Sequence, residues 1–301
     1  MTSIRVLAAG LGVVFLWASA FPAIRIAAPE LGPVGLSFVR IVVATITLLV
    51  FAPIGKVRPP AARHIPLILL CAFFGMTAYQ LLLNTGEVFV PAGTSSIIVA
   101  AAPLVSVGIA VVAFKERLSA VRVAGSICAV AGVLVVCLAR AGLSLSATVW
   151  IVVGAMVVQG IYHPLSRLVL RTYSALEVAT YMMVAGAVMT VPFVPFGWHQ
   201  LVTAHHEGWL AAIYLGVLPS AVGFVLWGYA VGRLPVVTST SLLYLVPAVA
   251  VLISFLWLGE IPLPVEYLGG AIVIIGVAAV SLGDRLLARS QSRTHHHGGT
   301  T

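Results

Sequence analysis

Residues 91–105 read PAGTSSIIVAAAPLV, and residues 235–249 read PVVTSTSLLYLVPAV. These two stretches belong to an internal repeat with an offset of 144 residues, which aligns Pro, Thr, Ser, Glu and Gly without a gap. An apolar background rarely matches such residue types by chance, so the repeat predicts a chain built from two related halves. The matched pairs are Pro91 and Pro235, Thr94 and Thr238, Ser95 and Ser239, Pro103 and Pro247, Glu116 and Glu260, Gly125 and Gly269, and Gly132 and Gly276.

The composition indicates what kind of protein these halves form. Hydrophobic residues make up 61% of the chain and charged residues only 8%, whereas a soluble domain carries about 25% charged residues. The apolar runs are continuous and about 20 residues long, the length of a helix that crosses a bilayer. Since the backbone must satisfy its own hydrogen bonds in lipid, we predict an all-α integral membrane protein.

The apolar runs predict ten transmembrane helices, five in each half. A half with an odd number of crossings sends its copy back in the opposite direction, so the two repeats are expected to be inverted. Inverted repeats are a common architecture of secondary transporters. The first repeat is predicted at 5–140, the second at 146–284 and a cytoplasmic tail at 285–301; the helices are expected near residues 6–28, 34–51, 65–83, 93–114, 121–138, 148–170, 176–196, 209–230, 236–258 and 265–282.

Most of the positively charged residues lie in or next to the predicted loops. With both termini in the cytoplasm, Arg and Lys gather in the inside loops, for example at Arg63, Lys115 and Arg171, while only Arg140 lies clearly outside. This asymmetry is the positive-inside rule. It explains the net charge of +8 by topology in a bacterial-type inner membrane, and we expect no nucleic-acid partner.

Motifs for catalysis and cofactor binding are missing from the sequence. Neither GxxxxGK[ST], HExxH nor GxSxG occurs, so transport driven by ATP, a metal site and a cofactor are not expected. The cysteines Cys71, Cys128 and Cys137 lie in apolar runs and indicate packing. An intramembrane enzyme would need facing Asp, Glu or His residues, and His163 stands alone, so this function is only a distant alternative.

Several local stretches resemble the paired EamA domains of the drug/metabolite transporter superfamily. They are FLWASAFPAIR at 15–25, SFVR at 37–40, PAGTSSIIVAAAPLV at 91–105, FKERLS at 114–119 and WLGEIP at 257–262. The aromatic residues are most similar to those of YddG-type exporters of aromatic and other amino acids. The resemblance implies a central cavity lined by the third, fourth, eighth and ninth helices with parts of the first and sixth, and peripheral fifth and tenth helices.

Within that expected cavity, the deep aromatic and ionisable residues are the candidate substrate contacts: Trp17, Tyr79, His163, Trp227 and Tyr244. Lipid-facing or core packing is an open alternative for each of them. His163 could also hydrogen-bond a carbonyl freed by Pro164. Arg40 lies deep and needs a partner, either another helix or a substrate, because a charge within the bilayer is costly.

Other intramembrane residues have expected structural roles. The prolines Pro22, Pro103, Pro164 and Pro247 interrupt backbone hydrogen bonds and are candidate hinges, or simply static bends. Arg25 is expected to reach the membrane surface, Glu87 to be solvated at the outer end of its helix, and Glu260 to act in a connector. The glycines of the fifth and tenth helices predict close packing, inside a monomer or at the seam of a weak homodimer.

Together these observations predict a secondary transporter that exports amino acids or related small metabolites by alternating access. Aromatic or other neutral amino acids suit an apolar chamber with polar tips. A channel-like facilitator, or an exporter of nucleosides, sugars or drugs, is the alternative. The expected partners are the small-molecule substrate and the lipid bilayer.

Overall fold

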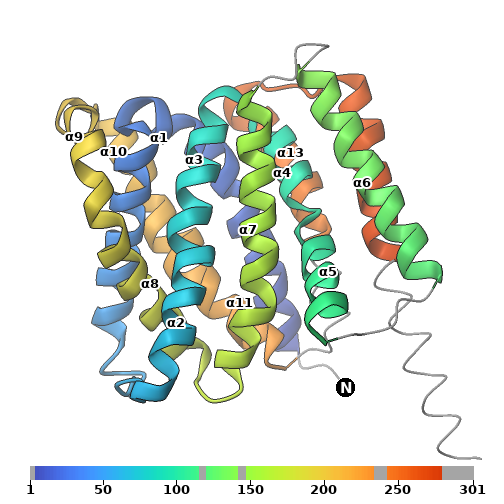
Figure 1. The fold of residues 1–301 in the computed structure, drawn as a ribbon. Helices are drawn as coiled ribbons and strands as arrows, with labels where there is room; N and C mark the ends of the chain where they lie inside the picture. The colour runs from blue at the N-terminus through green and yellow to red at the C-terminus, as the bar shows by residue number, and fades with distance from the viewer. Residues whose placement is uncertain (1–3, 115–119, 142–146, 234–242, 280–301) are drawn as a thin grey trace, which may run out of the picture.

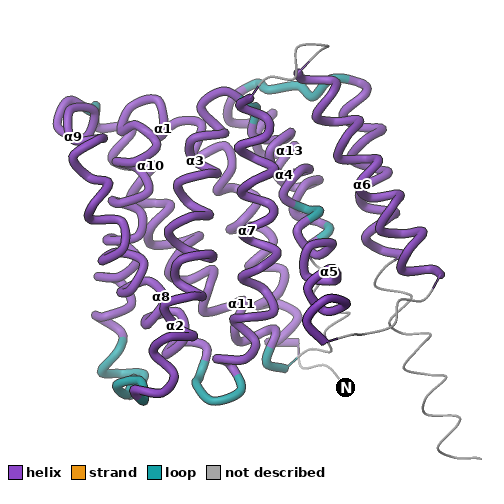
Figure 2. The backbone as a smooth tube through the Cα atoms, in the orientation of Figure 1, coloured by secondary structure: helices purple, strands orange, loops and turns teal. Residues whose placement is uncertain are grey.

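The computed structural model describes residues 4–114, 120–141, 147–233 and 243–279. Within these ranges the chain forms helices and short connections and has no β-strand (Figures 1 and 2). Large apolar side chains lie on the outside, including Phe15, Val188 and Phe196, which is 80% exposed. An apolar exterior of this kind fits a lipid environment, and together with the apolar helices it shows a multi-pass membrane protein.

The first element is a helical hairpin rather than a single rod. Helix α1 spans Ile4–Phe51 as one assigned element, but its backbone breaks at Gly32, where φ is +69° and ψ is 155°. Glycine adopts this region without steric cost, so the chain can reverse there. Figure 1 shows α1 rising from the end of the bundle at which the N-terminus lies and returning to it. The two legs correspond to the first two predicted helices.

The helices of the first half are interrupted at two places. The predicted helix at 65–83 is longer and consists of α2 (Ile65–Ala72), η2 (Phe73–Ala78) and α3 (Tyr79–Phe89). The predicted helix at 93–114 is divided into α4 (Ala92–Val99) and α5 (Ala102–Phe114), with the break just before Pro103. The short η1 (Ala62–His64) precedes α2, and α6 (Ala120–Ala141) follows the break in the described residues.

The second half has a similar series of helices. Its elements are α7 (Ala147–Leu170), α8 (Ala175–Thr190), η4 (Val191–Phe193), α9 (Val194–Thr203), α10 (His206–Leu215), η5 (Gly216–Val222), α11 (Gly223–Val231), α13 (Leu245–Leu258) and a helix over 264–279. Both η2 and η5 are π-helical turns within longer helices. Their positions differ by the offset of the sequence repeat, to within one residue, so the repeat extends to a local backbone irregularity.

Five of the described helical segments are long and apolar enough to cross a membrane. They are Ile4–Phe51, Ala62–Phe89, Thr148–Leu170, Ala175–Thr203 and His206–Ala230. Shorter apolar helices cover Ala92–Ser106, Val123–Val136, Leu245–Leu258 and Pro264–Ala279. The first of these segments holds the two legs of α1, on either side of the Gly32 break.

Helix α6 and the helix over 264–279 form a pair at the edge of the bundle, seen at the right of Figure 1. Their glycines face each other so closely that a Cβ on Gly132 would lie 2.7 Å from the backbone nitrogen of Val273. A Cβ on Gly276 would lie 2.4 Å from the nitrogen of Ala129. The glycine faces predicted from the sequence therefore pack against each other within this chain.

Candidate functional site

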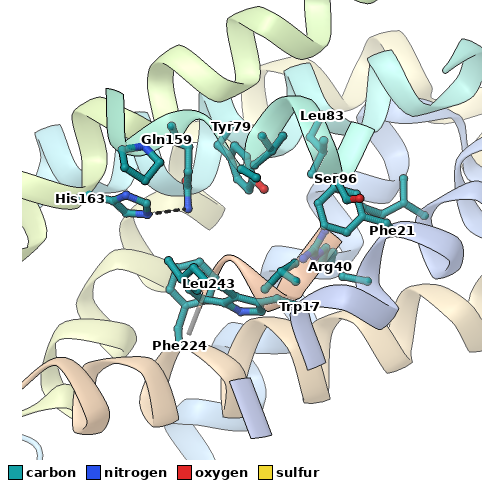
Figure 3. A pocket seen from close by; sticks show the side chains of 17 residues that line it. Trp17, Phe21, Arg40, Tyr79, Leu83, Ser96, Gln159, His163, Phe224 and Leu243 are labelled. Atoms are coloured by element: carbon teal, nitrogen blue, oxygen red, sulfur yellow. Dashed lines mark hydrogen bonds between the residues drawn. The ribbon is translucent and has the colours of Figure 1, made fainter. Parts of the chain in front are cut away.

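A cavity lies among the helices of both halves (Figure 3). Helix α1 contributes Trp17, Phe21 and Arg40, and α3 contributes Tyr79 and Leu83. The remaining walls come from α4, the start of α5, α7, α11 and the segment at the start of α13. Neither α6 nor the helix over 264–279 lines this cavity. Residues from the two repeats thus meet around one site. The other lining residues are Ala20, Ile24, Ser96, Val99, Ala100, Ala102, Pro103, Gln159, His163, Phe224, Leu243 and Val246.

Aromatic rings form one wall of the cavity. The ring centroid of Trp17 lies 5.3 Å from that of Phe224 and 5.4 Å from that of Trp227, both in tilted arrangements. The indole nitrogen of Trp17 donates a hydrogen bond of 3.2 Å to the carbonyl oxygen of Pro219. That carbonyl belongs to the π-helical turn η5, so the irregular backbone there fixes the orientation of the ring. The wall offers a rigid apolar surface to a ligand.

Arg40 is the charged residue at the opposite end of the cavity from His163 in Figure 3. Its side chain is buried, and its Nε atom donates a hydrogen bond of 2.8 Å to the hydroxyl of Ser220 on η5. Its Nη1 atom is buried without a hydrogen-bond partner among the described residues. A buried guanidinium with an unused donor next to an open cavity is a candidate anchor for an anionic group of a ligand.

His163 and Gln159 form the second polar group of the cavity. They lie one turn apart on α7, and their side-chain nitrogens approach to 3.4 Å. The Oε1 atom of Gln159 is buried without a partner among the described residues. The His163 ring also lies near the rings of Tyr162 and Trp227, with centroid separations of 5.9 Å and 6.5 Å. This end of the cavity offers an amide and an imidazole as hydrogen-bonding groups.

The five candidate contacts predicted from sequence lie in three different settings. Trp17, Tyr79 and His163 line the cavity. Trp227 is buried behind Trp17 and outside the lining set. Tyr244 is also outside it, and its hydroxyl donates to the carbonyl oxygen of Val277, which ties the start of α13 to the helix over 264–279.

Sequence reasoning missed several lining residues, chiefly Phe21, Ser96, Gln159 and Phe224. Gln159 had a readable signal, because it lies four residues before His163 and therefore on the same helical face. Phe21 and Phe224 had none, because apolar residues surround them in the sequence.

The four prolines of the predicted hinges also differ in setting. Pro22 and Pro164 lie inside α1 and α7, as the sequence indicated. Pro103 is instead in the first turn of α5, and Pro247 is in the first turn of α13. A proline in the first turn of a helix removes no backbone hydrogen bond, because the nitrogens there have no intrahelical partner. Pro103 nevertheless follows the break between α4 and α5 and lines the cavity.

A group of charged residues closes the end of the bundle opposite the N-terminus. The Nε atom of Arg25 pairs with Glu260 at 3.0 Å, and its Nη1 atom donates to the carbonyl oxygens of Glu87 and Val88. Glu260 also accepts a hydrogen bond from the backbone nitrogen of Ala92. Arg25 therefore joins the two halves at this end of the bundle, where it keeps part of its side chain exposed. Glu260 does lie in a connector.

The prediction for Glu87 was wrong, because its side chain is fully buried. Helix α3 continues to Phe89, so Glu87 lies in its last turn and packs within the bundle. Glu266 is likewise buried and accepts hydrogen bonds from Thr94 and from the nitrogen of Leu263.

The end of the bundle at which the N-terminus lies has its own contacts between the halves. Arg58, in the connection after α1, pairs with Glu177 of α8 at 2.9 Å, and this carboxylate raises the pKa of the Arg58 guanidinium. The hydroxyl of Tyr181 donates to the carbonyl oxygen of Arg58. The hydroxyl of Tyr173 accepts from the nitrogen of Ala61. Polar contacts between the repeats thus occur at both ends of the bundle.

The sequence pattern of the EamA-like transporter family matches this chain twice, at residues 4–138 and 146–282. The two matches cover nearly the whole chain and fall on the two halves that the internal repeat defines. The chain belongs to the EamA-like transporter family. This membership, with the transporter names of its relatives, indicates a membrane transporter rather than an enzyme.

Relatives of this EamA-like transporter include two bacterial proteins. The chain is 47% identical over 284 residues to a probable terminal-alkyne amino-acid exporter of Streptantibioticus cattleyicolor, covering 93% of this chain and 95% of that protein. It is 31% identical over 263 residues to the uncharacterized transporter YdfC of Bacillus subtilis, covering 87% and 86%. A solved crystal structure with 20% identity matches with a TM-score of 0.68 over 95% of this chain and 99% of its own, which shows a shared fold.

Proposed function

We propose that this EamA-like transporter exports amino acids with an apolar side chain, or closely related small metabolites, across the bacterial inner membrane by alternating access. The observation that carries the proposal is the unpartnered Nη1 atom of Arg40 beside a cavity walled by aromatic rings. The guanidinium would bind the substrate carboxylate, and the rings would contact its side chain. The amino-acid exporter at 47% identity supports this choice of substrate class.

The remaining polar groups of the cavity suit a zwitterion. Tyr79, Ser96 and Gln159 line the cavity with oxygens that can accept hydrogen bonds from an α-ammonium group. Rings such as Trp17 can also attract that cation by their negative faces. In this arrangement the two backbone charges of the amino acid are held by different polar residues. The side chain then lies in the apolar part of the chamber, and this favours neutral over charged amino acids.

The topology forms part of the proposal. The chain would cross the membrane ten times as two inverted five-helix repeats at 5–140 and 146–284, with both termini and the tail at 285–301 in the cytoplasm. The Gly32 break, the repeated π-helical turns and the shorter apolar helices support this count. Export would proceed as the halves rock around the cavity, with the four prolines Pro22, Pro103, Pro164 and Pro247 as candidate bending points.

Counterflow in proteoliposomes tests the substrate class. Vesicles loaded with an unlabelled neutral amino acid should accumulate the same amino acid in labelled form from outside, and an amino acid with a terminal alkyne should behave in the same way. Vesicles loaded with an unlabelled nucleoside or sugar should not accumulate its labelled form. Arg40→Gln should weaken the apparent affinity about 10- to 100-fold, because a hydrogen bond to a charged group contributes about 1.5–3 kcal/mol. Arg40→Lys should weaken the apparent affinity less than Arg40→Gln does, because it keeps the positive charge and loses only the planar pair of donors. Accumulation of nucleosides or sugars instead would overturn the amino-acid assignment.

A further inference from the structure

Glu87 is an unusual residue for the interior of a membrane bundle. Its side chain has no exposed surface, and both carboxylate oxygens are buried without a hydrogen-bond partner among the described residues. A buried ionised carboxylate without partners is strongly unfavourable, so such a group either takes up a proton or meets water and nearby charges. An unpaired carboxylate at this depth therefore needs a functional explanation.

Two further polar residues on α3 connect Glu87 to the region of the cavity. Gln80 and Asn84 lie seven and three residues before Glu87, so the three side chains share one face of the helix. All three are fully buried. Both amide atoms of Gln80 and the Oδ1 atom of Asn84 have no partner among the described residues, while Nδ2 of Asn84 donates to Ser37. Unsatisfied buried polar atoms in a row are typical sites for ordered water.

The charged groups that act on Glu87 form a small cluster. On α1, Arg25 donates from its Nη1 atom to the backbone carbonyl oxygen of Glu87 and pairs through Nε with Glu260, in the connector before the last described helix. Arg40, on the second leg of α1, also acts on the Glu87 carboxylate electrostatically. The other elements packed against α3 are α7, α4 and η2. Helices α4 and η2 carry no acidic or basic side chain, and the titratable residues of α7 and of α3 itself are Tyr162, His163, Arg167 and Tyr79. We name Arg25, Arg40, Glu87 and Glu260 the charge cluster.

We infer that Glu87 is a proton-binding site whose proton is taken up together with the substrate carboxylate. This inference rests on the proposed function, in which Arg40 binds that carboxylate. With Glu87 ionised, the charge cluster has two positive and two negative groups, and an added carboxylate leaves one excess negative charge. With Glu87 protonated, the cluster has one excess positive charge, which the carboxylate neutralises. Since unbalanced charge is costly in a low-dielectric interior, each ligand favours binding of the other.

The balance of the step is simple. A proton from bulk water converts the Glu87 carboxylate to a carboxylic acid as substrate binds, and the same proton returns to water on release. Gln80 and Asn84 would hold the water molecules through which it moves. A metal cation is a poorer occupant, because the charge cluster already contains the two guanidinium groups of Arg25 and Arg40, and Glu260 is paired with Arg25.

Infrared spectroscopy of the full chain in lipid tests the proton site without any substrate. The difference between acidic and alkaline spectra should contain a protonated-carboxyl band that Glu87→Gln removes. Glu207→Gln, at an exposed carboxylate, is the matched control and should retain it. Glu87→Asp, which keeps a titratable carboxyl, should retain a shifted band and serves as the second variant if glutamine prevents folding. A band unchanged by both Glu87 substitutions would overturn the inference.

Proteoliposomes containing a trapped pH indicator test the link to substrate. Uptake of a neutral amino acid should carry protons in the same direction, and Glu87→Gln should reduce the number of protons moved per amino acid at least tenfold. Three results would overturn the link but leave the proposed function standing. Protons could still move in Glu87→Gln, protons could move opposite to the substrate, or uptake could depend on a sodium gradient instead. Failure of wild-type counterflow with every amino acid would overturn the proposed function and with it the link, and the infrared result would still decide the proton site.

Discussion

At the scale of single residues, buried polar side chains distinguish this bundle from an inert apolar one. Arg40, Gln159 and Glu87 each retain at least one polar atom without a partner among the described residues. Natural proteins rarely bury such groups without water, ligand or ion. Their positions around and beside one cavity explain why we place both the substrate and the proton there.

An exposed pair provides a pH-dependent contact at the far end of the bundle. The ring Nδ1 atom of His205 lies 2.8 Å from a carboxylate oxygen of Glu30, and this hydrogen bond and the negative charge raise the pKa of His205. A raised pKa in the folded state means that the stabilisation is fully present below the ordinary histidine pKa of about 6.5 and is lost as the pH rises through the raised value.

We therefore expect the wild type to have a higher melting temperature than Glu30→Gln under mildly acidic conditions. In alkaline buffer, the two melting temperatures should become equal. Histidine NMR should show the pKa of His205 falling in Glu30→Gln. A constant melting-temperature difference across the pH range would show that the pair contributes no proton-linked stability.

At the scale of helices, close packing at glycine joins α6 to the helix over 264–279. A Cβ on Gly276 would lie 2.4 Å from the nitrogen of Ala129 and 2.6 Å from the carbonyl oxygen of Gly125. Backbone atoms cannot move aside as a flexible side chain can, so the helices must separate. Such close approach through small residues is a principal source of helix association in membranes.

The matched control for this contact is Gly108 in α5, where an added Cβ would meet nothing within 4 Å. We expect Gly276→Ala to lower the thermal stability of the purified protein clearly, and Gly108→Ala to leave it unchanged or raise it by about 0.5–1 kcal/mol through helix propensity. Equal melting temperatures for wild type and Gly276→Ala would contradict the packing described here.

The sequence predicted most helices but could not predict how far each one continues. Glu87 was expected in a solvated position because the apolar run ends near Leu83, yet α3 continues to Phe89 and buries it. Tyr244 was expected in the cavity because it lies deep in an apolar run, but its hydroxyl binds the carbonyl of Val277. Apolar periodicity determines helix existence, whereas the partner of each polar atom depends on packing between distant segments.

The same limit applies to Arg40, whose partner Ser220 is 180 residues away in the sequence. Sequence alone showed that this charge needs a partner and left open whether that partner is a helix or a substrate. The structure gives one guanidinium nitrogen a helix partner and leaves another without one among the described residues. By contrast, the repeat was readable because Pro, Gly and Glu matched at one offset.

At the scale of the whole molecule, polar contacts between the halves lie at both ends of the bundle. Arg25 with Glu260 lies at one end and Arg58 with Glu177 at the other. In alternating access, a contact that holds one end closed disfavours the state open at that end. Removing each carboxylate separately should therefore shift the conformational equilibrium in opposite directions.

A single cysteine in the cavity can report that shift. In a background without Cys71, Cys128 and Cys137, Ser96→Cys should react faster with a membrane-impermeant thiol reagent from the side that bears the Arg58–Glu177 pair when Glu177→Gln is present. With Glu260→Gln it should react faster from the opposite side. If both substitutions accelerated the thiol reaction from the same side, the two ion pairs would not close opposite ends of the bundle.

The central claim is that the carboxylate of an amino acid binds Arg40, and a thermodynamic cycle on that contact tests it most directly. The binding affinities of a neutral amino acid and of its primary amide would be measured for wild type and for Arg40→Gln. We expect wild type to prefer the amino acid by about 10- to 100-fold, equivalent to about 1.5–3 kcal/mol, and Arg40→Gln to lose that preference. An undiminished preference in Arg40→Gln would show that the carboxylate binds elsewhere and would contradict the account.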